Sequence, residues 1–201
     1  MRIGIVDYGA GNINSVANML DYLNIESEFI SDYKKLNSFQ KVILPGVGKF
    51  DAAVHNLHNN GFNEELIEFT RNNNNILLGI CLGSQLLLDI SEEGVEKGLG
   101  IISGESKKFR ESQDFPVPHM GWNTLSQMTD HPLFNDITEA DRFYFAHSFY
   151  LKVAAENVLA NTEYGDPFPS AIFSKNVFGL QFHPEKSLKS GMKVLKNFYK
   201  L

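Results

Sequence analysis

The stretch Ile76-Leu77-Leu78-Gly79-Ile80-Cys81-Leu82-Gly83 decides the interpretation of this chain. An apolar run that ends in a cysteine between two glycines predicts a buried strand, a sharp turn and a following helix. The glycines permit the strained backbone that such a turn needs. The first amides of the helix and its positive dipole end favour thiolate over thiol, and thiolate is the nucleophile. Cys81 is therefore the candidate nucleophile rather than a small core residue.

A second group of chemically useful residues lies a hundred positions later, in Gln181-Phe182-His183-Pro184-Glu185-Lys186-Ser187. This segment follows the apolar run Val177–Leu180, so His183 is expected at the end of a strand, where catalytic groups of parallel sheets collect. A cysteine nucleophile needs a base, and the base needs a group that fixes its tautomer. His183 and Glu185 project to the same side of an extended chain and can supply both.

Acyl transfer also requires hydrogen-bond donors for a developing oxyanion. The backbone N–H of Leu82, directly after the nucleophile, is one candidate donor. The loop Pro45-Gly46-Val47-Gly48 follows another expected strand and offers further free amides, and its candidate oxyanion residues are Val47 and Gly48. Glycines in this loop would let its backbone approach a substrate closely.

Alternation of apolar runs with helical spacing predicts parallel βαβ units in the first half of the chain. The second half is richer in strand patterns, so we expect an α/β fold whose later strands are partly antiparallel. The expected strands are 3–6, 28–30, 41–44, 76–80, 107–109, 142–145, 158–164, 171–174 and 177–182. The expected helices are 14–23, 52–57, 64–71, 85–90 and about 190–200, with a polar loop at 72–75.

Composition restricts the protein class. A chain of 201 residues with no repeat or long linker predicts a single domain over residues 1–201. The single cysteine forbids an internal disulfide and suits a reducing cytoplasm, and no segment reads as a signal or a membrane span. A formal net charge of −6 disfavours nucleic acid and anionic membranes as partners.

Two weaker patterns favour ordinary structural roles. The turn Gly9-Ala10-Gly11-Asn12 lacks the third glycine of a dinucleotide-binding fingerprint, and position 14 is Asn. His55 and His58 are three residues apart, with no acidic or cysteine ligands clustered beside them. We therefore expect neither a cofactor nor a metal ion.

Taken together, these motifs resemble class I, triad-type glutamine amidotransferases. More narrowly, they resemble the glutaminase subunits of imidazole glycerol phosphate synthases, of histidine biosynthesis. The resemblance runs nearly end to end and rests on the Cys81 and His183 motifs, Asp7–Asn12, Leu44–Gly48 and Pro118-His119-Met120-Gly121-Trp122-Asn123. It implies a three-layer α/β sandwich with a largely parallel central sheet and antiparallel strands in the C-terminal half.

The resemblance also implies a reaction and a set of residues. Glutamine would be hydrolysed to glutamate and ammonia through a thioester on Cys81. Ammonia would pass to a (β/α)8 barrel cyclase subunit in trans, which makes imidazole glycerol phosphate and AICAR. The implied substrate-binding residues are Gly46, Gln85, His147 and Ser148, and the implied partner-facing residues are Asn12, Trp122, Asn123 and Lys186.

Two positions depart from the family pattern. Ser84 stands where methionine is common, and Phe149 stands where tyrosine is common. These departures leave open a paralogous subunit that supplies ammonia for amidation of a bacterial surface-sugar precursor. A cysteine hydrolase of another substrate and a non-catalytic binding module are further alternatives, which Gln85 and the complete triad disfavour.

Overall fold

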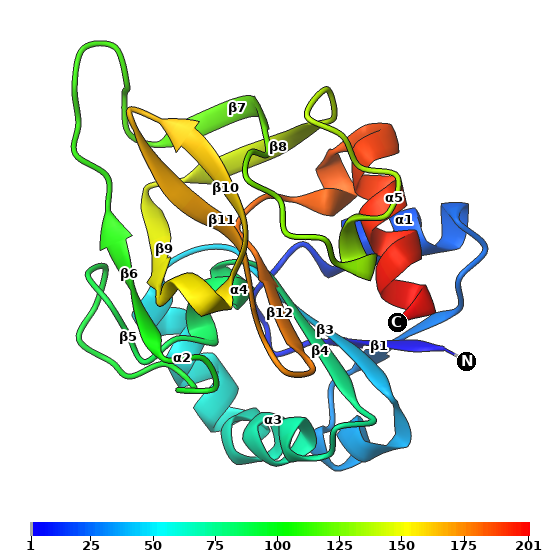
Figure 1. Cartoon of the computed structure of the whole chain (residues 1–201). Coiled ribbons are helices and arrows are strands. Elements are labelled where there is room, and N and C mark those ends of the chain that lie inside the picture. The colour runs from blue at the N-terminus through cyan, green and yellow to red at the C-terminus, as the bar shows by residue number, and fades with distance from the viewer. Residues whose placement is uncertain (1) are drawn as a thin grey trace.

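The computed structural model describes residues 2–201, and a seven-stranded sheet forms its centre (Figure 1). The strand order is β10-β11-β12-β4-β3-β1-β2. Neighbouring strands from β12 to β2 run parallel, whereas β10, β11 and β12 pair antiparallel. These strands are β1 (Ile3–Val6), β2 (Ser27–Ile30), β3 (Lys41–Gly46), β4 (Ile76–Cys81), β10 (Val158–Tyr164), β11 (Asp166–Ser174) and β12 (Val177–Leu180). The predicted α/β class, with its antiparallel later strands, is confirmed.

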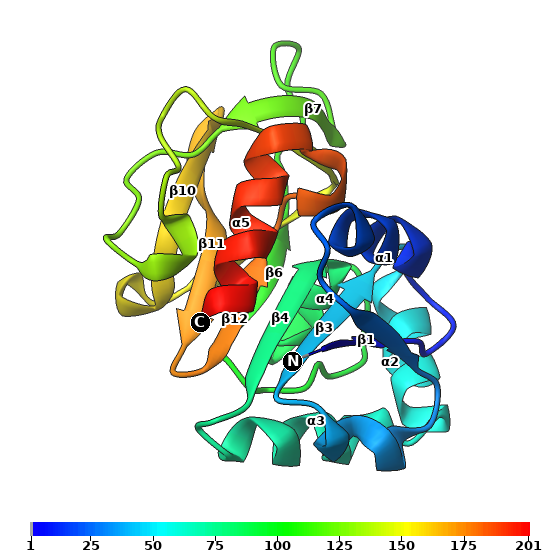
Figure 2. The same ribbon diagram turned by 90° about the vertical axis from the view of Figure 1, so that its right-hand side faces the viewer.

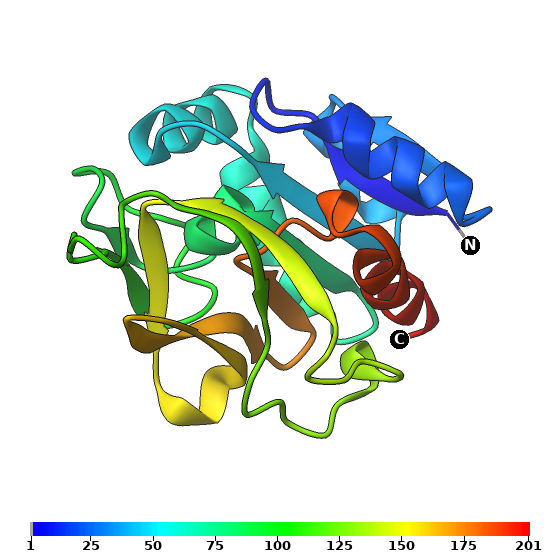
Figure 3. The ribbon, with the colours of Figure 1, turned by 90° about the horizontal axis from the view of Figure 1, so that it is seen from above.

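Helices cover both faces of this sheet and make three layers. On one face, α1 (Ile13–Tyr22) and α5 (Leu188–Lys200) lie side by side, as Figures 2 and 3 show. On the other face lie α2 (Phe50–Asn59), α3 (Phe62–Arg71) and α4 (Leu82–Leu86). Successive strand residues point to opposite faces. Ile43 and Leu78 accordingly share a core with α1 and α5, while Val42 and Leu77 share one with α2 and α3.

Two small sheets extend the C-terminal side of the main sheet. One contains β5 (Ile90–Ser91), β6 (Gly104–Lys108) and β9 (Phe149–Val153). The other is an antiparallel pair of β7 (His119–Thr124) and β8 (Arg142–His147), whose register sets His119 opposite His147. Short 3-10 turns occupy Tyr33–Ser38, Pro132–Phe134, Ala155–Asn157 and Pro184–Lys186.

The helix predicted over residues 85–90 is wrong in its position. The helix starts directly after Cys81 and ends at Leu86, and Ile90 belongs to a strand instead. A returning loop explains the early end, because it supplies other donors for the carbonyls that a longer helix would use. Leu99 donates to the Leu86 carbonyl at 2.8 Å, Ile101 to Leu87 at 2.9 Å and Gly100 to Leu88 at 3.1 Å.

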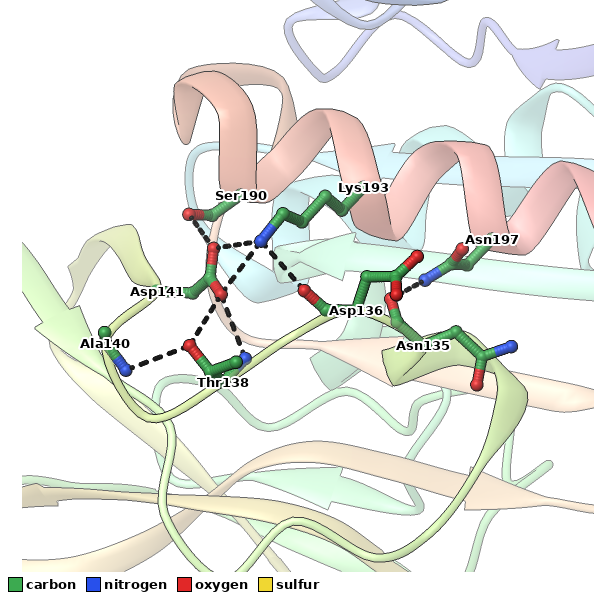
Figure 4. A network of polar contacts seen from close by, with 8 residues as sticks. All are labelled: Asn135, Asp136, Thr138, Ala140, Asp141, Ser190, Lys193 and Asn197. Atoms are coloured by element: carbon green, nitrogen blue, oxygen red, sulfur yellow. Dashed lines mark hydrogen bonds and ion pairs between the residues drawn. The ribbon is translucent and has the colours of Figure 1, made fainter.

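Polar contacts fix α5 to the rest of the molecule at both ends. Near its start, Asp141 accepts from Ser190 at 2.8 Å and from the Lys193 ammonium at 2.9 Å (Figure 4). At its end, the Lys41 ammonium of β3 donates to the Tyr199 carbonyl at 2.6 Å. Lys41 is 5% exposed, and burial lowers its pKa. These contacts position the turn that precedes α5. His183 and Glu185 lie in that turn.

None of the helices within residues 2–201 is long and apolar enough to cross a membrane.

Candidate active site

Cys81 lies at a strained turn between β4 and α4. Its backbone has φ 54° and ψ −111°, a conformation that residues other than glycine rarely adopt and that functional sites often store. Close packing surrounds the turn, since a Cβ on Gly83 would collide with the Leu44 carbonyl oxygen. A Cβ on Gly79 would lie 2.6 Å from the Gly83 carbonyl oxygen. The glycines on both sides of Cys81 are therefore required by close backbone approach.

His183 reaches the same edge of the sheet from the neighbouring strand. β12 pairs parallel with β4, with Leu180 opposite Ile80, so the residues after both strands emerge together. The backbone of His183 is fixed by donation to the Tyr144 carbonyl at 2.9 Å, and its own carbonyl accepts from Ser187 at 2.6 Å. Its side chain is 3% exposed.

Glu185 holds the imidazole of His183 in one orientation. The distance from His183 Nδ1 to Glu185 Oε1 is 2.8 Å, and both side chains are almost fully buried. A carboxylate oxygen only accepts, so Nδ1 carries the proton and Nε2 is directed elsewhere. Within residues 2–201, the second oxygen of Glu185 has no hydrogen-bond partner.

Electrostatics favour a charged imidazole next to the sulfur. Burial by itself lowers the pKa of His183, but the hydrogen bonds with Cys81 and Glu185 outweigh burial and raise that pKa to about 10. An imidazolium beside the thiol stabilises the thiolate form. α4 has only five residues, so the helix dipole at Cys81 is that of a short helix.

Cys81 lines a cavity of about 390 Å³, which suits a small metabolite. Its lining includes Val47, Gly48, Cys81, Leu82, Gln85, Met120, His147, Ser148, Phe149, His183 and Lys186. A larger cavity of about 730 Å³ lies beside β6 and the β10–β11 turn, but no cysteine or histidine lines it. The smaller cavity is therefore the candidate active site.

The candidate oxyanion residues lie at one wall of this cavity. β3 pairs with β4 so that Gly46 is opposite Cys81, and the following Val47 and Gly48 line the same cavity as Cys81. Gly46 itself is buried and does not line the cavity. A Cβ on Gly46 would lie 2.5 Å from the Gly83 nitrogen. Gly48 has φ 104°, a value that favours glycine.

The candidate substrate residues come from α4 and the β8–β9 connection. Gln85 is buried, and its Nε2 donates to the Phe149 carbonyl at 3.1 Å and to Gln181 Oε1 at 3.2 Å. Ser148 is half-buried and lines the cavity. His147 also lines the cavity, but both of its ring nitrogens already have protein partners.

Of the candidate partner-facing residues, only Lys186 lines the cavity. Trp122 is 40% exposed and packs edge-on against Tyr144, over whose ring the Lys186 ammonium lies at 5.8 Å. Asn12 is half-buried before α1. Asn123 differs from the other three, because its amide donates inward to the Glu163 carbonyl at 2.9 Å.

Comparison with known proteins identifies the family. The model of class-I glutamine amidotransferases matches residues 4–201. The chain belongs to this family. It is 44% identical to imidazole glycerol phosphate synthase subunit HisH 2 of Pseudomonas aeruginosa, over 99% of both chains. It is 43% identical to the subunit of the same name from Methanococcus maripaludis, over 98% of both chains. A solved structure of a glutamine amidotransferase, 18% identical, superimposes with a TM-score of 0.76 over 100% of this chain and 98% of its own.

The structure of this amidotransferase adds two residues that the sequence reasoning did not assign. Gln181 is fully buried and directs its Nε2 toward Cys81 Sγ at 4.0 Å. Tyr8 is also buried and donates to the Pro45 carbonyl at 2.9 Å, next to the oxyanion loop. Burial and the nearby Cys81 charge both raise the pKa of Tyr8. Tyr8 belongs to the Asp7–Asn12 motif, and Gln181 begins the motif that contains His183. The sequence therefore marked both positions but did not predict their contacts.

The two positions that depart from the family pattern make hydrogen bonds beside Cys81 and Gln85. Ser84 donates its hydroxyl to the Cys81 carbonyl at 2.6 Å, which holds the nucleophile turn from the helix side. Phe149 contributes its backbone carbonyl, which accepts from Gln85 and His147. Neither contact depends on a methionine at position 84 or a tyrosine hydroxyl at position 149.

Proposed function

We propose that this chain hydrolyses L-glutamine to glutamate and ammonia, with Cys81, His183 and Glu185 as its triad. The observation that carries the proposal is the buried His183–Glu185 pair beside a strained cysteine, in a member of the class-I glutamine amidotransferases. The thiolate is the nucleophilic form of cysteine, and a neighbouring imidazolium stabilises that form.

Each step uses a residue already at the cavity. The Cys81 sulfur attacks the side-chain amide carbon and forms a carbon–sulfur bond. His183 gives its proton to the amide nitrogen, the carbon–nitrogen bond breaks, and ammonia leaves a thioester. Water then attacks the thioester while His183 takes its proton, and glutamate leaves as the carbon–sulfur bond breaks. Glu185 stabilises the imidazolium whenever it forms.

Backbone amides supply the remaining stabilisation of the transition state. The carbonyl oxygen gains negative charge in both steps, and preorganised N–H donors around it lower the barrier. Leu82 follows the nucleophile directly, and Gly48 faces the same cavity. In this proposal Gln85 contacts the bound glutamine, and the His147–Ser148 segment holds its α-amino and carboxylate groups.

We propose further that the ammonia passes to a (β/α)8 cyclase subunit in a heterodimer. Free ammonia is mostly ammonium in neutral water, so a shielded path preserves the nucleophile. The full-length relatives are named imidazole glycerol phosphate synthase subunits, which supports histidine biosynthesis over the surface-sugar alternative. Met120 is exposed and lines the cavity, and the exposed Trp122 lies two residues further along β7, so the two side chains offer the partner an apolar surface. A cytoplasmic location agrees with this pathway.

The test measures glutamate release by the purified chain, alone and with a histidine-pathway cyclase that holds its acceptor substrate. We expect slow hydrolysis alone, a large increase with the partner, and no hydrolysis by Cys81→Ala under either condition. Val95→Ala is the matched control, because Val95 is 91% exposed and does not line the cavity. Undiminished hydrolysis by Cys81→Ala would overturn the triad. Stimulation only by a surface-sugar cyclase would favour the alternative pathway.

A further inference from the structure

We propose that His119 is a positioning residue for glutamine hydrolysis, because it anchors the substrate-facing Ser148–Phe149 segment through the ring of His147. The inference rests on the proposed function of the cavity and assigns a role to a residue that does not line it. His119 and His147 stand opposite one another on β7 and β8. Their rings are joined by a hydrogen bond of 3.1 Å between His119 Nδ1 and His147 Nε2.

The neighbours of the two rings determine where every proton lies. His147 Nδ1 is 2.8 Å from the Phe149 carbonyl, which only accepts, so this nitrogen must carry a proton. In a neutral ring, His147 Nε2 is then bare and must accept from His119 Nδ1. His119 Nε2 is bare in turn and accepts from the Asn123 amide at 3.4 Å. The donation therefore runs in one direction, from Asn123 through both rings to Phe149.

Burial keeps both rings neutral, as this scheme requires. His119 is 3% exposed and His147 is 6% exposed. Burial lowers the pKa of His119 to about 4 and that of His147 to about 3. A protonated ring would turn an acceptor nitrogen into a donor facing another donor. At neutral pH the chain of hydrogen bonds is consequently complete.

The last acceptor of the chain is part of the candidate substrate site. The Phe149 carbonyl accepts from His147 and also from Gln85 Nε2 at 3.1 Å. The preceding Ser148 carbonyl accepts from the Phe109 amide at 3.1 Å. Both carbonyls of the segment are thus fixed, which fixes the direction of the groups that Ser148 and Phe149 present to the cavity. Loss of one fixed carbonyl loosens the surface on which glutamine rests.

The first donor of this hydrogen-bond chain, Asn123, lies on β7, which carries two of the candidate partner-facing residues, Trp122 and Asn123. Asn123 follows the exposed Trp122 on β7, and its amide is oriented by donation to the Glu163 carbonyl. The relay therefore connects a partner-facing strand with the glutamine cavity through two buried rings. Phe145 and Tyr164 stack on the His119 ring at centroid distances of 4.8 and 4.0 Å, so packing is the competing explanation for this histidine.

A pair of substitutions separates hydrogen bonding from packing. His119→Phe keeps a stacking ring and loses the donor, whereas His119→Asn loses the ring and keeps an amide donor near the position of Nδ1. We expect His119→Phe to raise the KM for glutamine about tenfold, with a smaller change in kcat, since one buried neutral hydrogen bond is lost. We expect His119→Asn to stay within about threefold of the original KM, despite a lower melting temperature.

If His119→Phe retains the original KM and His119→Asn does not, the role of His119 is packing and the proposal is overturned. Equal loss in both variants, or no loss in either, would also overturn it. Circular dichroism verifies that each variant is folded. Activity of Cys81→Ala reports separately on the proposed function, so a failed triad and a failed relay are distinguishable.

Nitrogen NMR of the unmodified chain provides a test that needs no substrate. With ¹⁵N-labelled histidine, we expect two rings in the neutral Nδ1–H form that do not titrate between pH 8 and about 5.5, because their pKa values are strongly lowered by burial. His119→Asn removes one of these signals and thereby assigns it. An Nε2–H tautomer at His119, or titration near its ordinary pKa, would refute the relay.

Discussion

Replacement of Glu185 by glutamine tests the electrostatic logic of the triad while keeping the volume of the side chain. The 2.8 Å bond from His183 Nδ1 to Glu185 Oε1 is charge-assisted and buried. Hydrogen bonds to charged groups contribute ~1.5–3 kcal/mol, about twice the contribution of neutral ones. The glutamine variant keeps a neutral bond, so the expected loss of transition-state stabilisation is ~1–2 kcal/mol. That loss lowers kcat/KM for glutamine about 5–30-fold.

The same substitution also changes the pH dependence in a fixed direction. Burial lowers the pKa of His183, and the hydrogen bonds with Cys81 and Glu185 raise it to about 10. Without the carboxylate, burial is opposed only by Cys81, so the pKa falls. A loss of ~1–2 kcal/mol corresponds to about one pKa unit. The alkaline limb of kcat/KM, where the imidazolium loses its proton, therefore moves about one pH unit toward acid.

The assay is glutamate release between pH 5 and pH 11, measured for Glu185→Gln, for the original chain and for Glu156→Gln. The last variant is the matched control, since Glu156 is exposed and removal of its charge leaves the cavity unchanged. Thermal unfolding shows whether lost activity reflects lost folding. If Glu185→Gln keeps the original kcat/KM with an unmoved alkaline limb, Glu185 does not support His183 and the proposed triad is incorrect.

Three further outcomes concern stability. Gly83→Ala should lower the free energy of unfolding by about 3 kcal/mol in urea denaturation, because its Cβ would collide with the Leu44 carbonyl. Asp141→Asn should lower the free energy of unfolding by about 1–2 kcal/mol, because the Lys193 ammonium loses its charged acceptor. An unchanged melting temperature would contradict this expectation. His119 and His147 have pKa values lowered to about 4 and about 3. Below the ordinary histidine pKa, the unfolded chain binds protons at these two rings and the folded chain does not. The free energy of unfolding therefore falls between about pH 6.5 and pH 4, by up to ~1.4 kcal/mol per pH unit for each ring. His119→Phe should make this fall with pH less steep.

Sequence reasoning succeeded where a local pattern determines local structure. The apolar run before Cys81 predicted a buried strand, and β4 lies between β3 and β12 at the centre of the sheet. The sequence also predicted His183 at a strand end, where catalytic groups of parallel sheets collect. The structure adds that β12 and β4 are adjacent and parallel. The roles assigned to these residues in catalysis, and those of Gln85 and Ser148 in substrate binding, stay predictions.

Sequence reasoning failed where long-range contacts override local preference. β7 was not predicted, because Met120 and Trp122 face solvent and its pairing with β8 is the source of its order. The contact of Gln181 with Gln85 spans 96 positions and follows no local spacing. The bond between His119 and His147 likewise depends on strand register, which a single sequence does not specify here.

The contact between Lys41 and the Tyr199 carbonyl has a practical consequence for handling this protein. Proteolytic trimming of the last three residues would strip a buried ammonium of its acceptor and release the final turn of α5. The damage would spread along α5 toward the turn that contains His183 and Glu185. Preparations clipped at this end should therefore lose heat tolerance before they lose any residue of the cavity, and mass spectrometry of the intact chain is the appropriate quality check.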